Sequence, residues 1–346
     1  MAVKSLAVKY RPKSFDDVVE QSSIKIILQQ QLYSNETKNA YLFCGGAGTG
    51  KTTCARIFAI EINHNQGNPI EMDAASNSGV EDVRSIIQQA KTKSLDSEYK
   101  VFIIDECHSI SNTGWQAFLK LIEEPPAKSV FIFCTTDPQK IPKTILSRVQ
   151  RYDFSRISFD KIVDRLVYIC ERERDSVNAE LKWELDAIKY IAKVADGGMR
   201  DAITLMDKCI AYNSNLTMEN VIHAIGTVDY DTMFALTNDL IDKHPDNVLM
   251  IIENVHHAGK DLKQFIKTYT NFVLDLNKYG CLKSFDIVEI PNSYKNVMDK
   301  YTAQSYEEFK KLLATMVKLN ADIKWETSPK AVIEAVLVLK CMEVNE

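Results

Sequence analysis

Apolar and polar positions follow two different patterns along this chain. Over residues 1–156, short runs that are apolar almost throughout alternate with segments whose apolar residues recur every three or four positions. The expected strands are Ala40–Cys44, Pro69–Met72, Lys100–Ile104 and Val130–Cys134. The helices expected between them are Lys51–Ile62, Gly79–Lys91 and Thr113–Ile122. This alternation predicts an α/β domain built on a parallel sheet with both faces covered by helices.

From Ser158 onward the strand pattern disappears and only helical spacing remains. Breaks fall at Asp196–Gly198, near Lys243–Asp246 and across Tyr279–Ser293. We therefore expect three modules: an α/β domain over residues 1–156, a small helical domain over 157–225 and a second all-helical domain over 226–346.

The composition is that of a folded, water-soluble protein. Hydrophobic residues make up 45% of the chain and charged residues 26%, a balance that excludes wholesale disorder. The apolar runs are too short to cross a bilayer, and the opening Met-Ala-Val-Lys-Ser-Leu lacks the apolar core of a secretory signal. We expect a cytoplasmic protein with no membrane partner.

Charge is unevenly distributed along the chain, whose net charge is −5. Residues 1–156 hold 19 basic and 17 acidic residues, a net charge of +2, and the remainder holds 23 and 30, a net charge of −7. This distribution excludes an obviously basic, non-specific nucleic-acid binder but leaves room for a local basic face. The eight cysteines are scattered singly, without a Cys-x-x-Cys pair, and are expected to be reduced thiols.

A glycine-rich segment follows the first expected strand and precedes a helix. It reads Gly45-Gly46-Ala47-Gly48-Thr49-Gly50-Lys51-Thr52 and fits the pattern G-x-x-x-x-G-K-[ST]. Glycines let backbone N–H groups turn inward around phosphates, and the start of the helix adds its positive end. We expect these residues, with Thr53, to bind a nucleotide, Lys51 to neutralise its phosphates and Thr52 to ligate Mg²⁺.

Two carboxylates, Asp105 and Glu106, end the third expected strand. On their own, two acids at this position are often a solvated strand end. Downstream of a phosphate-binding loop they favour a metal ligand, Asp105, and a residue that activates the attacking water, Glu106.

Several further stretches occur in an order typical of one protein family. They are Lys9–Pro12, Phe15–Val19, Asp73–Ser76, Asp105–His108, Leu119–Pro126, Thr135–Lys140, Ile145–Arg148 and Gly198–Ala202. With the glycine-rich loop, they make the chain resemble the AAA+ ATPases, and among these the clamp-loader subunits of the bacterial DNA polymerase III gamma/tau kind. The specific matches run from about residue 4 to 210, and the rest fits only in helical character.

The resemblance implies roles for further residues. Tyr10, Arg11, Pro12, Val18 and Val19 would surround the adenine of ATP. Thr136 matches the sensor 1 position, near the γ-phosphate or the water, and Arg200 matches sensor 2 in the helical lid. Arg148 matches the arginine finger that completes the site of a neighbouring subunit, with Val149 replacing the usual cysteine.

The chain departs from the family pattern at two places. The family usually carries a four-cysteine zinc module where this chain has Glu61–Pro69, which holds no cysteine, so we expect no zinc. Basic residues that often face DNA are replaced by Asn77, Ser78, Gly79 and Asn112, which leaves Arg84 further along as the basic residue of this region. We expect the helix starts near Ser78, where Ser78 and Glu81 fit a capping box, and near Thr113 to offer N–H groups to phosphate.

The function implied by the resemblance is that of a clamp-loader ATPase. Its partners would be a sliding clamp, primer–template DNA and other loader subunits in a homo- or hetero-oligomer, and the second helical domain would be the collar. We expect a compact subunit without the tail that longer family members carry after the third module. Two alternatives stay open: another AAA+ DNA-remodelling motor, and a nucleotide-binding scaffold subunit that hydrolyses little ATP itself.

Overall fold

The computed structural model describes residues 4–77, 79–94, 96–177, 179–226, 230–285, 287–288, 290, 294–304 and 306–342. It divides into two compact units, Met1–Leu181 with Ile191–Asp207, and Lys182–Tyr190 with Lys208–Glu346. The division into three modules over residues 1–156, 157–225 and 226–346 stays a prediction.

The first unit is built on a parallel sheet of five strands in the order β2-β3-β4-β1-β5. The strands are β1 (Ala40–Gly45), β2 (Ile70–Asp73), β3 (Lys100–Asp105), β4 (Ser129–Thr135) and β5 (Gln150–Phe154). The first four confirm the sequence pattern, and β5 was missed. It is an edge strand in which Arg151 and Asp153 are exposed while Tyr152 and Phe154 are buried, so its short alternating pattern lacks a continuous apolar run.

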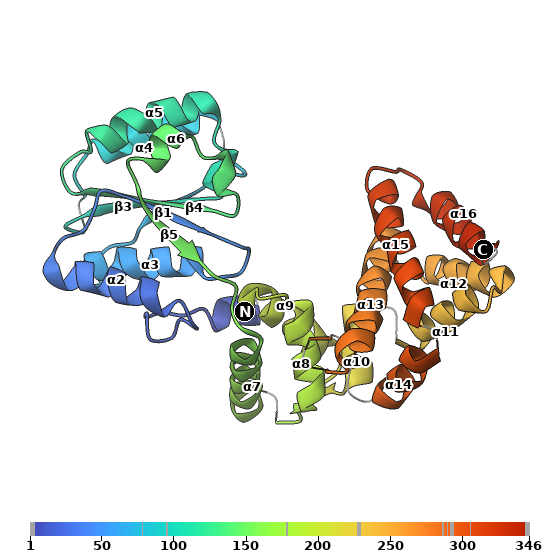
Figure 1. Ribbon diagram of the computed structural model, residues 1–346. Coiled ribbons are helices and arrows are strands. Elements are labelled where there is room, and N and C mark those ends of the chain that lie inside the picture. The colour runs from blue at the N-terminus through green and yellow to red at the C-terminus, as the bar shows by residue number, and fades with distance from the viewer. Residues whose placement is uncertain are drawn as a thin grey trace. The chain divides into compact units, whose positions relative to one another are not determined.

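Helices cover both faces of this sheet, as Figure 1 shows. One face carries α2 (Ser22–Ser34) and α3 (Lys51–Ile62), and the other carries α4 (Val80–Ala90), α5 (Asn112–Glu123) and the short α6 (Lys143–Leu146). Successive strand residues point to opposite faces and therefore feed two cores. Leu42 and Phe133 belong to the core under α4 and α5, whereas Phe43 and Ile132 belong to the core under α3.

The start of α4 differs in detail from the expected capping box. The helix begins at Val80, Gly79 occupies the cap position, and a carboxylate oxygen of Asp82 accepts a hydrogen bond from the Gly79 N–H at 3.2 Å. Ser78 lies outside the described residues. The acceptor is therefore Asp82 rather than Glu81.

The remaining elements of the first unit surround the end of the sheet from which the glycine-rich loop leaves. They are α1 (Leu6–Lys9), the 3₁₀ turns η1 (Cys107–Ser109) and η2 (Pro138–Lys140), α7 (Phe159–Ser176) and the start of α9 (Met199–Tyr212). Leu166 and Cys170 of α7 and Met206 of α9 are fully buried. Helices α7 and α9, which belong to the predicted helical lid, thus both contribute buried apolar side chains.

The second unit is almost entirely helical. Its helices are α10 (Met218–Ile225), α11 (Tyr230–Ile241), α12 (Pro245–His257), α13 (Leu262–Leu282), α14 (Lys295–Gln304), α15 (Tyr306–Ile323) and α16 (Pro329–Met342), and α8 (Leu185–Val194) begins in it. A pair of two-residue strands, β6 (Lys182–Trp183) and β7 (Asn215–Leu216), corrects the expectation that no strand follows Ser158. Two residues are too few for any periodic pattern to reveal.

Helix α13 is the centre of this unit and packs against α14 and α15. Buried polar groups fix its position: Asn277 donates to the Phe309 carbonyl at 3.0 Å, and the Tyr269 and Thr237 hydroxyls are hydrogen-bonded at 2.8 Å. Such satisfied buried polar pairs hold a helix in one register. Among the described residues, no helix has the length and apolar character needed to cross a bilayer.

Candidate nucleotide-binding site

The glycine-rich loop links the carboxyl end of β1 to the amino end of α3. Gly48 has φ +69°, and a Cβ atom at this position would lie 2.9 Å from Cα of Gly198. Only glycine satisfies both the left-handed backbone and this close approach. The Met199 N–H donates to the Gly48 carbonyl at 3.1 Å, so the loop is joined directly to the start of α9.

Lys51, the first residue of α3, lies inside the loop with only 6% of its surface exposed. Its ammonium donates to the carbonyls of Gly45 at 2.9 Å and Gly46 at 2.7 Å. Burial lowers the pKa of Lys51 below its ordinary value. The sequence therefore places a desolvated cation where the loop would surround phosphate groups.

The next residue, Thr52, connects the loop to β3. Its hydroxyl donates to Oδ2 of Asp105 at 2.8 Å, and Oδ1 of Asp105 accepts the Glu106 N–H at 3.0 Å. A hydroxyl and a carboxylate are hard oxygen ligands of the kind that Mg²⁺ prefers. The residues present fit an Mg²⁺ ion beside the phosphates that the loop would hold.

Glu106 and Thr136 come from two adjacent strand ends, those of β3 and β4. Oε2 of Glu106 accepts the Thr136 hydroxyl at 3.1 Å. Glu106 has φ +46°, a left-handed conformation that is uncommon outside glycine and is often found at functional sites. The structure thus brings together the two residues proposed to handle the attacking water.

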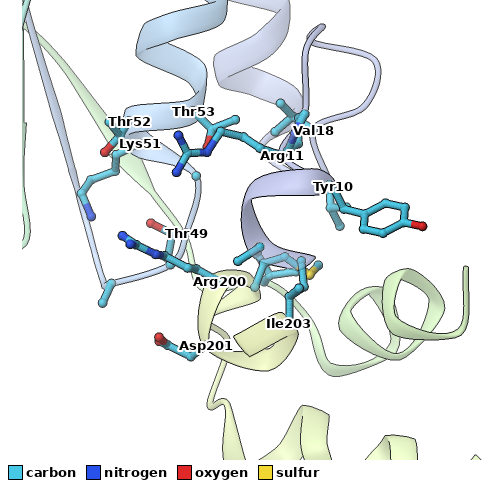
Figure 2. Close-up of a pocket in the computed structure, with 18 of the residues that line it drawn as sticks. Tyr10, Arg11, Val18, Thr49, Lys51, Thr52, Thr53, Arg200, Asp201 and Ile203 are labelled. Carbon is cyan, nitrogen blue, oxygen red and sulfur yellow. The ribbon is translucent and has the colours of Figure 1, made fainter. Parts of the chain in front are cut away.

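Arg200 is the second residue of α9 and lines the same cavity as Lys51. Figure 2 shows its side chain reaching from α9 toward the glycine-rich loop. The cavity measures about 280 Å³. Its walls include the residues predicted for the nucleotide except Gly45, Gly46 and Thr136; they are Tyr10, Arg11, Pro12, Val18, Val19, Ala47–Thr53, Asp105, Glu106 and Arg200.

The predicted adenine wall divides into two parts. Figure 2 shows Arg11 directed toward the start of α3 and the Tyr10 ring directed away from it. The Tyr10 hydroxyl donates to Oε1 of Glu173 in α7 at 2.6 Å, which together with burial raises the pKa of Tyr10. Lys9 pairs with the same oxygen at 2.6 Å, and Arg165 donates to the Tyr10 carbonyl at 3.0 Å. Tyr10 therefore ties the N-terminal segment to α7.

Arg148 lies outside this cavity, directly after α6. Its guanidinium forms an ion pair with Glu123 at 2.8 Å and donates to the Thr144 carbonyl at 2.8 Å. The side chain is 39% exposed. The structure therefore does not bring Arg148 to the nucleotide site of its own chain.

Sequence reasoning missed three residues that support the site. The buried Gln21 side chain donates to the Ser155 carbonyl at 2.8 Å and to the Thr49 carbonyl at 3.4 Å. Glu173 accepts hydrogen bonds from Lys9 and Tyr10. His108 contacts Glu106. Gln21 is marked only by a left-handed backbone, φ +54°, which no sequence pattern reveals. The contacts of these three residues depend on partners distant in sequence or on the conformation of a turn. The spacing of apolar residues along the chain therefore could not predict them.

The positions considered for DNA contact are only partly defined by the structure. Arg84 pairs with Glu81 at 2.9 Å on the exposed surface of α4. Asn112 begins α5, whose preceding residue, Ser111, accepts the Gly114 N–H at 3.2 Å. Contact between either helix start and DNA stays a prediction.

The cysteines form no disulfide, and all eight are described. In the part of the chain that the structure describes, no three His, Cys, Asp or Glu residues group as a metal site. The expected absence of zinc stays a prediction.

Comparison with solved structures finds a likeness in fold over most of the chain. The chain is similar to Thermotoga maritima RuvB, a Holliday junction branch migration motor, with a TM-score of 0.51, 18% identity and coverage of 83% of this chain and 98% of that one. At this identity the likeness concerns the fold alone. The chain therefore shares the fold of that protein.

Comparison with sequence families is more specific. Residues 63–158 match the family "DNA polymerase III, delta subunit", and residues 161–215 match "DNA polymerase III clamp loader subunit, ATPase lid domain". The chain is 33% identical to DNA polymerase III subunit tau of Bacillus subtilis, over 100% of this chain and 64% of that protein. It is 28% identical to DNA polymerase III subunit gamma of Buchnera aphidicola, over 98% of each.

The chain spans less than two thirds of several relatives, with 64% of the Bacillus subtilis protein and 43% of the Escherichia coli tau subunit covered. The matched region nevertheless includes the whole of this chain in the first case and 75% of it in the second. Together with the lid match, these similarities show that the chain resembles the gamma and tau subunits of DNA polymerase III over its whole length.

Proposed function

We propose that this chain is an ATP-hydrolysing clamp-loader subunit. It would open a sliding clamp and place it on primer–template DNA, together with other loader subunits in the bacterial or host cytoplasm. The similarity to gamma and tau subunits of DNA polymerase III and the match to a clamp-loader lid domain support this function. The observation that carries it is the convergence of Lys51, Thr52, Asp105 and Glu106 at one end of the sheet.

The loop residues Gly45–Thr53 would hold the phosphates of ATP through backbone N–H groups and the Lys51 ammonium. Thr52 and Asp105 would hold Mg²⁺, which when bound neutralises phosphate charge. The apolar Val18 and Val19, with the segment Tyr10–Pro12, would bind the adenine. These contacts bind and orient the nucleotide.

Hydrolysis needs a base for the attacking water, and Glu106 is the candidate. Its carboxylate would take the proton from the water as the water oxygen attacks the γ-phosphorus and the bond to the leaving ADP oxygen breaks. Thr136 would hold the water or a γ-phosphate oxygen beside Glu106, and Arg200 would contact the γ-phosphate from α9. A scaffold subunit that hydrolyses little ATP would have no need of an ordered Glu106–Thr136 pair.

Arg148 would act on the ATP site of a neighbouring subunit. Its partly exposed position outside the cavity of its own chain supports this assignment. A cation supplied by the neighbour makes hydrolysis depend on assembly, because the site of a single chain is incomplete. The helical region after the lid would provide the collar through which the subunits assemble.

The test is to compare the wild-type chain with Glu106→Gln in the reconstituted assembly. We expect Mg-ATP to bind both with similar Kd, because Glu106 is not a phosphate ligand, while turnover falls by about 100-fold or more in the variant. Equal turnover would show that Glu106 is not the base. Lack of Mg-ATP binding by the wild-type chain would contradict the function as a whole.

A further inference from the structure

We propose that His108 is a positioning residue for Glu106, holding one carboxylate oxygen so that the other is presented to the attacking water. This inference rests on the proposed ATPase activity and assigns a role to a residue that the mechanism above does not use. His108 lies in the 3₁₀ turn η1, directly after Glu106 and the end of β3.

The imidazole of His108 lies between two strand ends. Its Nδ1 atom is 3.3 Å from Oε2 of Glu106 and 3.2 Å from Oγ1 of Thr135. Thr135 ends β4 and is completely buried, and its hydroxyl oxygen also accepts the Asp137 N–H at 3.0 Å. The ring is therefore anchored to a rigid part of the sheet rather than to solvent.

The partners decide which ring nitrogen carries the proton. An ionised carboxylate can only accept hydrogen bonds, so a ring that carries its proton on Nδ1 is the form attracted to Oε2 of Glu106 at 3.3 Å. The Thr135 oxygen can accept the same N–H in a shared hydrogen bond. An imidazole that carries its proton on Nδ1 suits both contacts.

The contacts to Glu106 are asymmetric. Both Thr136, at 3.1 Å, and His108 approach Oε2, and no described residue donates a hydrogen bond to Oε1. A carboxylate that accepts the Thr136 hydroxyl at one oxygen and has Nδ1 of His108 3.3 Å from the same oxygen cannot rotate freely about its terminal bonds. Oε1 is then the oxygen that faces the water, and orientation of this kind lowers the barrier to attack without affecting nucleotide affinity.

The neighbours of His108 in the turn show that its contact is not a packing requirement. Cys107 is completely buried and serves the core, whereas the His108 side chain is 19% exposed. Ser109 is half-buried and contributes to the turn through its N–H, which donates to the Glu106 carbonyl at 3.0 Å. Ser109→Ala is therefore a matched control that keeps the turn and leaves the Glu106 carboxylate contacts in place.

The experiment measures kcat and KM for ATP in the reconstituted assembly. His108→Leu removes the donor, whereas His108→Asn keeps an N–H donor close to the position of Nδ1. We expect His108→Leu to lower kcat by about 10-fold or more with KM changed less than about twofold, His108→Asn to recover most of the loss, and Ser109→Ala to match the wild type.

Three results would overturn the inference. One is a His108→Leu enzyme with wild-type or raised kcat, the latter meaning that His108 holds Glu106 away from the water. Another is an equal loss in His108→Leu and His108→Asn with a matching loss of thermal stability, which would indicate a structural role. The third is a wild-type assembly without ATP turnover, and that result alone also removes the proposed function.

Discussion

The hydroxyl of Thr52 donates a hydrogen bond to Asp105 at 2.8 Å across a sequence separation of 53 residues. This contact joins the start of α3 to the carboxyl end of β3. In the sheet, β3 and β1 lie on either side of β4, so the two strand ends are not directly paired. The Thr52–Asp105 hydrogen bond therefore links the phosphate loop to the strand that carries both carboxylates.

Replacing Thr52 tests whether this pair holds Mg²⁺. Thr52→Val keeps the shape of the side chain but removes the hydroxyl, so we expect ATP turnover to fall about 10-fold or more and to require higher Mg²⁺ concentrations. Thr52→Ser keeps the hydroxyl and should retain most activity. Titrating turnover with Mg²⁺ checks this, and a Thr52→Val enzyme with wild-type Mg²⁺ dependence would contradict the assignment.

Replacing Gly48 tests the close approach of the loop to α9. An added Cβ would meet Cα of Gly198 at 2.9 Å in a left-handed backbone conformation. We expect Gly48→Ala to lower the free energy of unfolding by about 1–3 kcal/mol and to weaken nucleotide binding. Gly46→Ala is the control, because its nearest neighbour would be a Thr49 methyl at 3.7 Å. Chemical unfolding gives the free energy of unfolding of both variants. Equal stability of the two variants would contradict the backbone strain expected in Gly48→Ala.

The buried environment of Lys51 predicts a pH dependence of ATP affinity. Burial lowers the pKa of the free-state ammonium below its ordinary 10.5, and bound phosphates favour the charged form. Affinity should therefore be constant at low pH and fall as pH rises through this lowered pKa, earlier than for an exposed lysine. Arginine keeps its charge, so Lys51→Arg should not show this fall. Nucleotide titrations across pH check it, and the same fall in Lys51→Arg would implicate another group.

Variants of Arg148 and Glu123, which form an ion pair, test the proposed arginine-finger role of Arg148 separately from its contact within its own chain. Arg148→Ala should leave ATP binding by the chain unchanged but lower turnover of the assembly by about 100-fold or more. Glu123→Ala removes only a partly exposed ion pair, so we expect the free energy of unfolding to fall by about 1 kcal/mol or less. Turnover of this variant should stay within about twofold of wild type. Binding and turnover measured on the same preparations check this. A loss of ATP binding in Arg148→Ala would place the residue in its own site instead.

The sequence predicted the parts of this molecule that are determined locally. The first four strands are buried apolar runs, and the loop around Lys51 combines a strand, glycines and a helix start in one short segment. Such features depend only on residues that are neighbours in the sequence, so they could be predicted directly from it. The strand β5 was missed because its exposed Arg151 and Asp153 interrupt the apolar pattern.

The supporting residues of the site could not be predicted because their partners are set by the tertiary structure. Gln21 reaches the Ser155 carbonyl across 134 residues, and Tyr10 reaches Glu173 across 163. His108 lies in the stretch Asp105–His108 that contributes to the family resemblance, but the sequence assigned it no role. Its contact with Glu106 depends on the left-handed turn at Glu106, which the sequence does not encode in any pattern.

The most direct test of the central claim is steady-state ATP hydrolysis by the reconstituted assembly with its clamp, with and without primer–template DNA, across salt concentrations. We predict that primed DNA stimulates turnover, that the stimulation fades as salt rises because phosphate contacts release counterions, and that Glu106→Gln abolishes it. Turnover that is indifferent to primed DNA at every salt concentration, or that survives Glu106→Gln, would contradict the account.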